Sequence, residues 1–117
     1  ACISYSNQMK IRLLKVSKNT IINYGAVSHQ TALAMVKGLN KITDSEILLS
    51  VTGVAGPSGG TLRTPVGCVF FGIGSKINKK YTFKTAKKIF HEKTRHAIQK
   101  KSTEYAMYLI LKELKKI

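Results

Sequence analysis

The 117 residues carry a formal net charge of +15, and 44% of them are hydrophobic, which is enough apolar material for one globular domain. The longest apolar run, residues 105–111, is too short to cross a bilayer and no leader-like segment opens the sequence, so we expect a cytoplasmic protein with no membrane partner. Cys2 and Cys68 form neither a disulfide framework nor a metal-ligand spacing with the histidines, and we predict two buried thiols and no metal site.

The chain opens with an extended segment that leads into a helix. Residues 1–5 are extended in character and have the composition of a strand. Ser6 then offers a side-chain oxygen that can cap a helix, and Met9, Leu13 and Val16 recur at the spacing of one helical face. We therefore expect these three apolar residues to be buried.

Two further helices are predicted before the first internal strand. Residues 17–24 have the pattern of a short helix that ends at Gly25, and Ser28 can cap the next helix. The apolar positions of that next helix are Ala32, Met35, Val36 and Leu39. We expect these helices to pack together on one face of a sheet.

The second half of the chain predicts three strands and one long helix. Residues 47–51 and 66–75 are nearly continuous apolar runs, whereas residues 79–85 alternate aromatic and polar side chains as a half-exposed strand does. The last two strands can form an antiparallel hairpin around residues 76–78. Residues 94–116 have the pattern of one long helix.

Together these elements predict an α/β fold. We expect residues 1–117 to form a single domain, a three-layer α/β/α sandwich with a mixed sheet. The last helix is apolar on more than one side, because residues 105–111 are all apolar and one sheet face can hide only one stripe. That helix therefore predicts a homo-oligomer, unless other parts of the same protein cover it.

The most unusual stretch is the loop that follows residues 47–51. It holds Gly53, Gly56, Gly59 and Gly60 together with Pro57, so its backbone is free to turn and to aim several N–H groups at one point. Such a nest can bind the phosphate of a small molecule, and open α/β sheets place ligands at the carboxyl ends of their strands. The alternative is a long connection between two strands with no ligand.

The positive charge also has two interpretations. A basic surface can bind nucleic acid, but seventeen of the twenty basic residues are lysines rather than the arginines that recognise phosphates and bases in a fork. Thirteen of the twenty fall from Lys76 onward, on a predicted hairpin and helix surface. We therefore favour a solvated charged face and do not expect a nucleic-acid partner.

Two residues near the start of the chain suggest chemistry. Tyr5 and Lys10 flank the junction between the first strand and the first helix, so both can face one crevice. A lysine acts as a base when desolvation or nearby positive charge lowers its pKa, and a tyrosine hydroxyl can hold the amine by hydrogen bonding. Against this stands the general rule that about nine in ten helix-surface lysines are solvated and chemically idle.

In combination, these motifs resemble the C-terminal domain of the CinA family, the competence/damage-inducible proteins whose domain also occurs alone as nicotinamide-nucleotide amidohydrolase. The resemblance runs over nearly the whole chain, in order and spacing. The segments that carry it are Ser4 to Lys10, Gly25 to Ser28, Thr52 to Pro57 with Gly59 and Gly60, and Pro65 to Gly67.

The resemblance implies an amide hydrolase that converts nicotinamide mononucleotide to nicotinate mononucleotide and ammonia, with a small-molecule nucleotide as substrate and no cofactor or metal. It implies a serine nucleophile, with Lys10 as the base and Tyr5 as the residue that orients it. The positions matching the family's substrate-binding residues are Thr52, Gly53, Ala55, Gly56, Gly59, Gly60 and Arg95.

The family's nucleophile lies in a Glu-Ser-Cys-Thr-Gly-Gly segment upstream of the matching region, and no such segment occurs in these 117 residues. We therefore expect an N-terminally truncated form of the domain that holds half of a catalytic site. The alternative is a non-catalytic nucleotide-binding or assembly module that keeps the fold and the pocket. Nucleic-acid binding is a third hypothesis, supported only by the charge and by the family's name.

Overall fold

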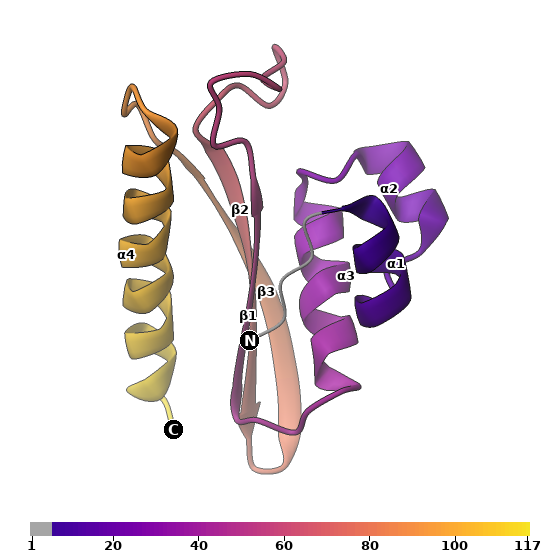
Figure 1. Ribbon diagram of the computed structural model, residues 1–117. Helices are drawn as coiled ribbons and strands as arrows, with labels where there is room; N and C mark the ends of the chain where they lie inside the picture. The colour runs from indigo at the N-terminus through magenta and orange to yellow at the C-terminus, as the bar shows by residue number, and fades with distance from the viewer. Residues whose placement is uncertain (1–5) are drawn as a thin grey trace.

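The computed structural model describes residues 6–117, which fold into three layers, with one sheet between two helical layers (Figure 1). The sheet has the order β1 (Ile47–Gly53), β2 (Cys68–Ile77) and β3 (Lys80–Ile89). One face carries α1 (Asn7–Leu14), α2 (Lys18–Tyr24) and α3 (His29–Asn40), and the other face carries α4 (Arg95–Leu114). The predicted three-layer α/β architecture is confirmed.

The strands that the structure describes all pair antiparallel, β1 with β2 and β2 with β3. The parallel part of the expected mixed sheet depends on residues 1–5. These residues, which include Cys2 and Tyr5, lie outside the described part of the chain. The mixed character of the sheet therefore stays a prediction.

Three helices begin at a side chain that caps them, and the sequence shows why. Ser6, Ser28 and Thr94 are extended in backbone conformation, and each side-chain oxygen accepts a hydrogen bond of 3.1 Å from the backbone N–H three residues later. These bonds satisfy donors that a helix end otherwise leaves without a partner. The caps at Ser6 and Ser28 were predicted, and both helices begin there.

The buried face of α1 differs from the prediction. Met9 is 37% exposed and Leu13 is 40% exposed, whereas Lys10 and Leu14 are the buried residues of this helix. Leu14 packs in one hydrophobic cluster with Val16 and with Met35 of α3. The contact with α3 therefore selects the face one residue further along the helix, and only Val16 is buried as expected.

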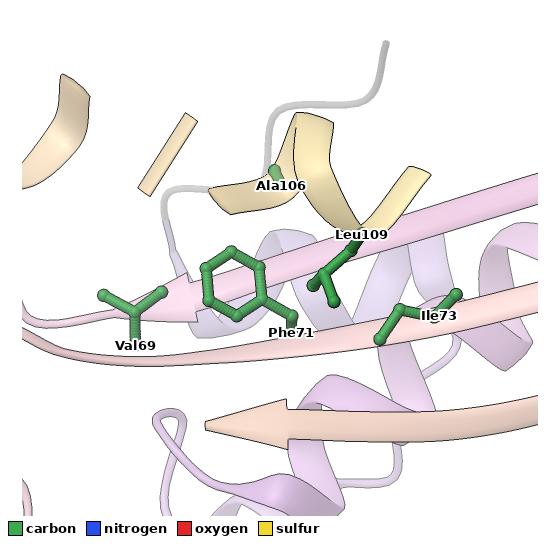
Figure 2. Close-up of a cluster of buried hydrophobic side chains, with 5 residues drawn as sticks. All are labelled: Val69, Phe71, Ile73, Ala106 and Leu109. Atoms are coloured by element: carbon green, nitrogen blue, oxygen red, sulfur yellow. The ribbon is translucent and has the colours of Figure 1, made fainter. Parts of the chain in front are cut away.

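The core lies on both sides of β2, whose first eight residues are all buried. Val69, Phe71 and Ile73 point to α4 and pack against Ala106 and Leu109 (Figure 2). On the opposite face Cys68 and Phe70 pack against Ala32 of α3. Burial raises the pKa of the Cys68 thiol, so this cysteine is a buried protonated thiol as predicted.

β1 is more exposed than its sequence suggested. Its burial alternates along the strand, and Val51 is 42% exposed. The expectation of a near-continuous buried strand here is wrong, because in the described sheet β1 lies at an edge and β2 takes the central place. The opposite edge strand, β3, carries Lys80, Lys84, Lys87 and Lys88.

The hairpin between β2 and β3 forms as predicted, with its turn one to two residues later than expected. Ile77 pairs with Lys80, and the two residues between them, Asn78 and Lys79, have φ angles of 53° and 65°. Positive φ at both central residues is the signature of the tight turn that matches the right-handed twist of a hairpin, and asparagine tolerates it well.

A buried carboxylate ties the end of α4 to the sheet. The side chain of Glu113 is 3% exposed, forms ion pairs with Lys84 and Lys116, and accepts a hydrogen bond of 3.1 Å from the Ser75 hydroxyl. Burial alone would raise the pKa of Glu113, but the hydrogen bond and charge of Lys84, with Ser75 and Lys116, outweigh burial and lower the pKa. The same pairing raises the pKa of Lys84.

Replacing Lys84 by methionine should lower the free energy of unfolding by about 2 kcal/mol at neutral pH, because the buried carboxylate loses its strongest partner. The loss should shrink in acid, since a carboxylate with a lowered pKa contributes stability above its ordinary value of 4.5 and loses it as the pH falls through the folded-state value. Urea unfolding at both pH values measures this. Lys80→Met on the same strand is the control, and an equal loss there would contradict the assignment.

Part of α4 faces away from the sheet and remains apolar. Met107, Tyr108, Leu111 and Leu114 are each more than half exposed. An apolar groove of about 370 Å³ runs beside this helix, with β1 forming its other wall. The described residues do not cover this groove, and the expected homo-oligomer stays a prediction. Within the same residues, no helix combines the length and the hydropathy needed to span a membrane.

Candidate functional site

The glycine-rich loop joins β1 to β2 at one end of the sheet (Figure 1). Its base is closed by two backbone hydrogen bonds, from the N–H of Val54 to the Cys68 carbonyl at 3.0 Å and from the N–H of Gly67 to the Val54 carbonyl at 2.7 Å. Gly56 and Gly59 have φ angles of 75° and 92°, a conformation that other residues rarely adopt. The glycines are therefore required by the shape of the loop.

Arg95, the first residue of α4, braces this loop. Its Nη1 donates a hydrogen bond of 2.9 Å to the carbonyl of Gly56. Elsewhere in the loop, a Cβ added at Gly60 would approach the backbone nitrogen of Val66 to 2.8 Å. Arg95 and Gly56, both predicted site residues, thus meet in the structure, through a contact that holds the loop itself.

A cleft of about 570 Å³ opens between the loop and the helices of the α3 face. One wall is the end of α2 and the start of α3, and the other is the loop. Phe70 of β2 and Lys87 of β3 also line it. The remaining lining residues are Asn23, Tyr24, Gly25, Ala26, Val27, Ser28, His29, Gln30, Val54, Gly59, Thr61, Arg63 and Thr64.

Buried hydroxyl groups hold the helical wall of the cleft in place. Thr52 Oγ1 donates to the carbonyl of Ala26 at 2.7 Å, which ties β1 to the turn before α3. Ser28 Oγ and Thr31 Oγ1 both donate to the carbonyl of Gly25, at 3.1 and 2.6 Å. Thr52 is 7% exposed and does not line the cleft, so its visible role is to position the turn that does.

Lys10 is the other notable residue of this helical layer. It is only 7% exposed, and burial lowers the pKa of its amine below the ordinary value of 10.5. Lys10 lies on α1, which packs on α3, and it does not line the cleft formed by the described residues. A lysine with a lowered pKa keeps more of its amine neutral, which is the form that can accept a proton.

The remaining predicted site residues lie in different parts of the structure. Gly59 lines the cleft beside α3, whereas Gly53 and Ala55 line the apolar groove beside α4. Tyr5 lies outside the described residues. In the described range, no group of three or more histidine, cysteine, aspartate or glutamate side chains is placed to hold a metal ion.

The sequence analysis missed three basic residues of the cleft: His29, Arg63 and Lys87. Their positions in the chain are far apart, and each belongs to a different element. A signal was present for two of them, because His29 directly follows the capping Ser28 and Arg63 lies inside the glycine-rich loop. For Lys87, nothing in the sequence distinguishes it from the other lysines of β3.

Comparisons with known proteins match nearly the whole chain. A family model described as the CinA C-terminal domain matches residues 1–114. A curated relative from Alkaliphilus metalliredigens (strain QYMF), whose name describes a competence-damage inducible protein, is 44% identical over 100% of this chain and 27% of its own length. A CinA-like protein from Fusobacterium nucleatum is 43% identical over 97% of this chain and 26% of its own.

Solved structures agree with the fold. The crystal structure of competence/damage inducible protein CihA from Agrobacterium tumefaciens superposes with a TM-score of 0.85 at 29% identity, covering 94% of this chain and 65% of that chain. The present chain spans about a quarter of the length of the two curated relatives.

Proposed function

Because this chain belongs to the CinA C-terminal domain family, we propose that it forms part of the active site of an amide hydrolase that releases ammonia from nicotinamide mononucleotide. The observation that carries the proposal is the buried Lys10, whose pKa is lowered by desolvation at the position where the family resemblance implies a catalytic base. The cleft beside the glycine-rich loop supports the binding of a nucleotide.

The proposed chemistry needs a serine from outside these 117 residues. The neutral amine of Lys10 accepts the proton of the serine hydroxyl while the serine oxygen attacks the carboxamide carbon. The C–N bond then breaks, and the lysine ammonium returns its proton to the leaving nitrogen, which departs as ammonia. Water hydrolyses the resulting acyl-enzyme to release nicotinate mononucleotide. Tyr5 would orient the lysine amine, and backbone N–H groups would hold the oxyanion.

Ammonia release tests the proposal. A longer protein that carries the family's serine segment should convert nicotinamide mononucleotide, and the 117-residue chain alone should not. The physical reason is that the covalent route needs the serine that Lys10 would activate, and direct attack of water forgoes that route. Coupled detection of ammonia, with nicotinate mononucleotide identified by mass, measures both proteins side by side.

The same experiment distinguishes the amide hydrolase from the second candidate function, a non-catalytic nucleotide-binding or assembly module. That function predicts that the longer protein binds nicotinamide mononucleotide and returns it unchanged. Turnover by the 117-residue chain alone would contradict both functions, because the nucleophile would then lie within these 117 residues. The observation that favours the second candidate is the position of Lys10, which does not line the cleft formed by the described residues.

A further inference from the structure

The cleft collects basic side chains from three separate elements. His29 comes from the start of α3, Arg63 from the glycine-rich loop and Lys87 from β3. None of the cleft's lining residues is an aspartate or glutamate. Among the described residues, the ion pairs engage Lys84, Lys101 and Lys116, so the three basic residues of the cleft are not used in them. Such a cavity presents concentrated positive charge to an anion.

Two of these basic side chains, His29 and Lys87, contact the same aromatic ring, that of Phe70. The His29 ring meets the edge of Phe70 at a centroid distance of 4.7 Å, and Lys87 Nζ lies 5.5 Å from the centroid of the same ring. His29 Nδ1 is also 2.8 Å from the hydroxyl of Thr85, two residues before Lys87 on β3. Because side chains alternate along a strand, Thr85 and Lys87 share the face that looks toward α3.

The third basic side chain, Arg63, belongs to the glycine-rich loop. Arg63 lies between Thr61 and Thr64, whose hydroxyls are 2.9 Å apart, and the N–H of Thr64 donates to Thr61 Oγ1 at 3.0 Å. This small turn belongs to the loop wall of the cleft, and Arg63 is one of the residues that line it. The positive end of the α3 dipole adds to the same field.

We propose that this cleft binds the phosphate group of the nucleotide, held by His29, Arg63 and Lys87, and that Arg95 serves to position the loop. The inference rests on the proposed function for the identity of the nucleotide. A phosphate monoester is a dianion with three acceptor oxygens, and a guanidinium group with an ammonium group matches it in charge and in donors. Arg95 already donates to the Gly56 carbonyl, which gives it a role inside the loop.

Phosphate binding can be measured on the 117-residue chain directly. We expect inorganic phosphate, titrated at constant ionic strength, to shift the backbone NMR signals of His29, Gly59 and Lys87 saturably. Lys87→Ala and Arg63→Ala should each weaken the affinity about 10-fold, because each removes a charge-assisted hydrogen bond. Lys87 and Arg63 are both at exposed positions, so these variants should keep the fold.

Lys88→Ala is the matched control. It removes the same charge from the neighbouring position of the same strand, but Lys88 Nζ lies 5.0 Å from the Tyr105 ring on the α4 side of the sheet. Its affinity for phosphate should change less than twofold. An equal loss in Lys88→Ala, or shifts that do not saturate, would overturn the proposal, because binding would then follow net charge alone.

The outcome is separable from that of the proposed function. Saturable phosphate binding with no ammonia release from the longer protein would contradict the amide hydrolase and leave the phosphate site standing. Ammonia release with a KM for nicotinamide mononucleotide that Lys87→Ala and Arg63→Ala do not change would contradict the phosphate site and leave the hydrolase standing.

Discussion

Replacing Lys10 by methionine in the longer, serine-containing protein is expected to lower the rate of ammonia release by about 100- to 10,000-fold, the usual contribution of a general base. Methionine keeps the apolar stem that fills the buried site and removes only the amine, so the fold should survive. Lys10→Ala should lose as much activity and also some stability, because it leaves a cavity. Steady-state kinetics and thermal unfolding of both variants separate the two effects.

The pH dependence gives a second readout of the same residue. The rate should rise with pH as the Lys10 amine loses its proton. The midpoint of this rise should lie at a pH below 10.5, the ordinary pKa of lysine, because burial lowers the pKa of Lys10. Lys18→Ala, at an exposed position at the start of α2, is the control and should keep both the rate and its pH profile. A Lys10→Met protein with full activity would show that the base lies elsewhere.

Replacing Gly38 by valine is expected to cost at least about 3 kcal/mol of unfolding free energy, one of the largest single-residue losses in this fold. A Cβ at Gly38 would lie 1.6 Å from the carbonyl oxygen of Leu14 and 2.6 Å from its carbonyl carbon. Both obstacles are backbone atoms, so α1 and α3 would have to separate. The cluster of Leu14, Val16 and Met35 would then lose its packing.

The control for this substitution is Lys37→Val, at the preceding and exposed position of α3. It brings the same β-branched residue into the same helix, and the helix penalty alone should amount to well under 1 kcal/mol. Urea unfolding of both variants gives the difference. If Gly38→Val lost no more stability than Lys37→Val, the close contact between α1 and α3 would be wrong.

Local signals predicted the elements of this fold well. Ser6 and Ser28 each offer an oxygen before an apolar run, and both cap helices where expected. The alternation of Tyr81 and Phe83 with polar residues marked the outer strand of the hairpin. These features depend on residues within a few positions of one another, so the sequence is enough to detect them.

What the sequence did not predict depends on contacts between distant segments. The five apolar or small residues 47–51 predicted a buried strand, and only the neighbours of β1 in space determine that Val51 is 42% exposed. His29 and Thr85 are hydrogen-bonded although they lie 56 positions apart in the chain, and no local sequence pattern predicts that contact. The cleft was missed for this reason, although its glycine-rich wall was recognised.

Lys10 also shows the difference between what local sequence signals predict and what contacts between distant segments determine. Its residue type and the family resemblance pointed to a base, but sequence alone cannot distinguish a buried lysine from the many exposed ones in a chain with seventeen lysines. The packing of α1 on α3 turns Lys10 inward and leaves Met9 and Leu13 outward, the reverse of what helical periodicity suggested. Burial, which only the tertiary structure determines, therefore carries the chemical argument.

The two edges of the described sheet are not equivalent in one further respect. Along β3, Lys80, Lys84, Lys87 and Lys88 surround the outer row of backbone N–H and C=O groups, and another strand approaching there would have to bury or displace their charges. The seven residues of β1 include no charged residue and no proline to prevent such pairing. In the described sheet, edge charge therefore disfavours pairing along β3 more than along β1. A further strand that approached this sheet would meet fewer charged side chains on the β1 side.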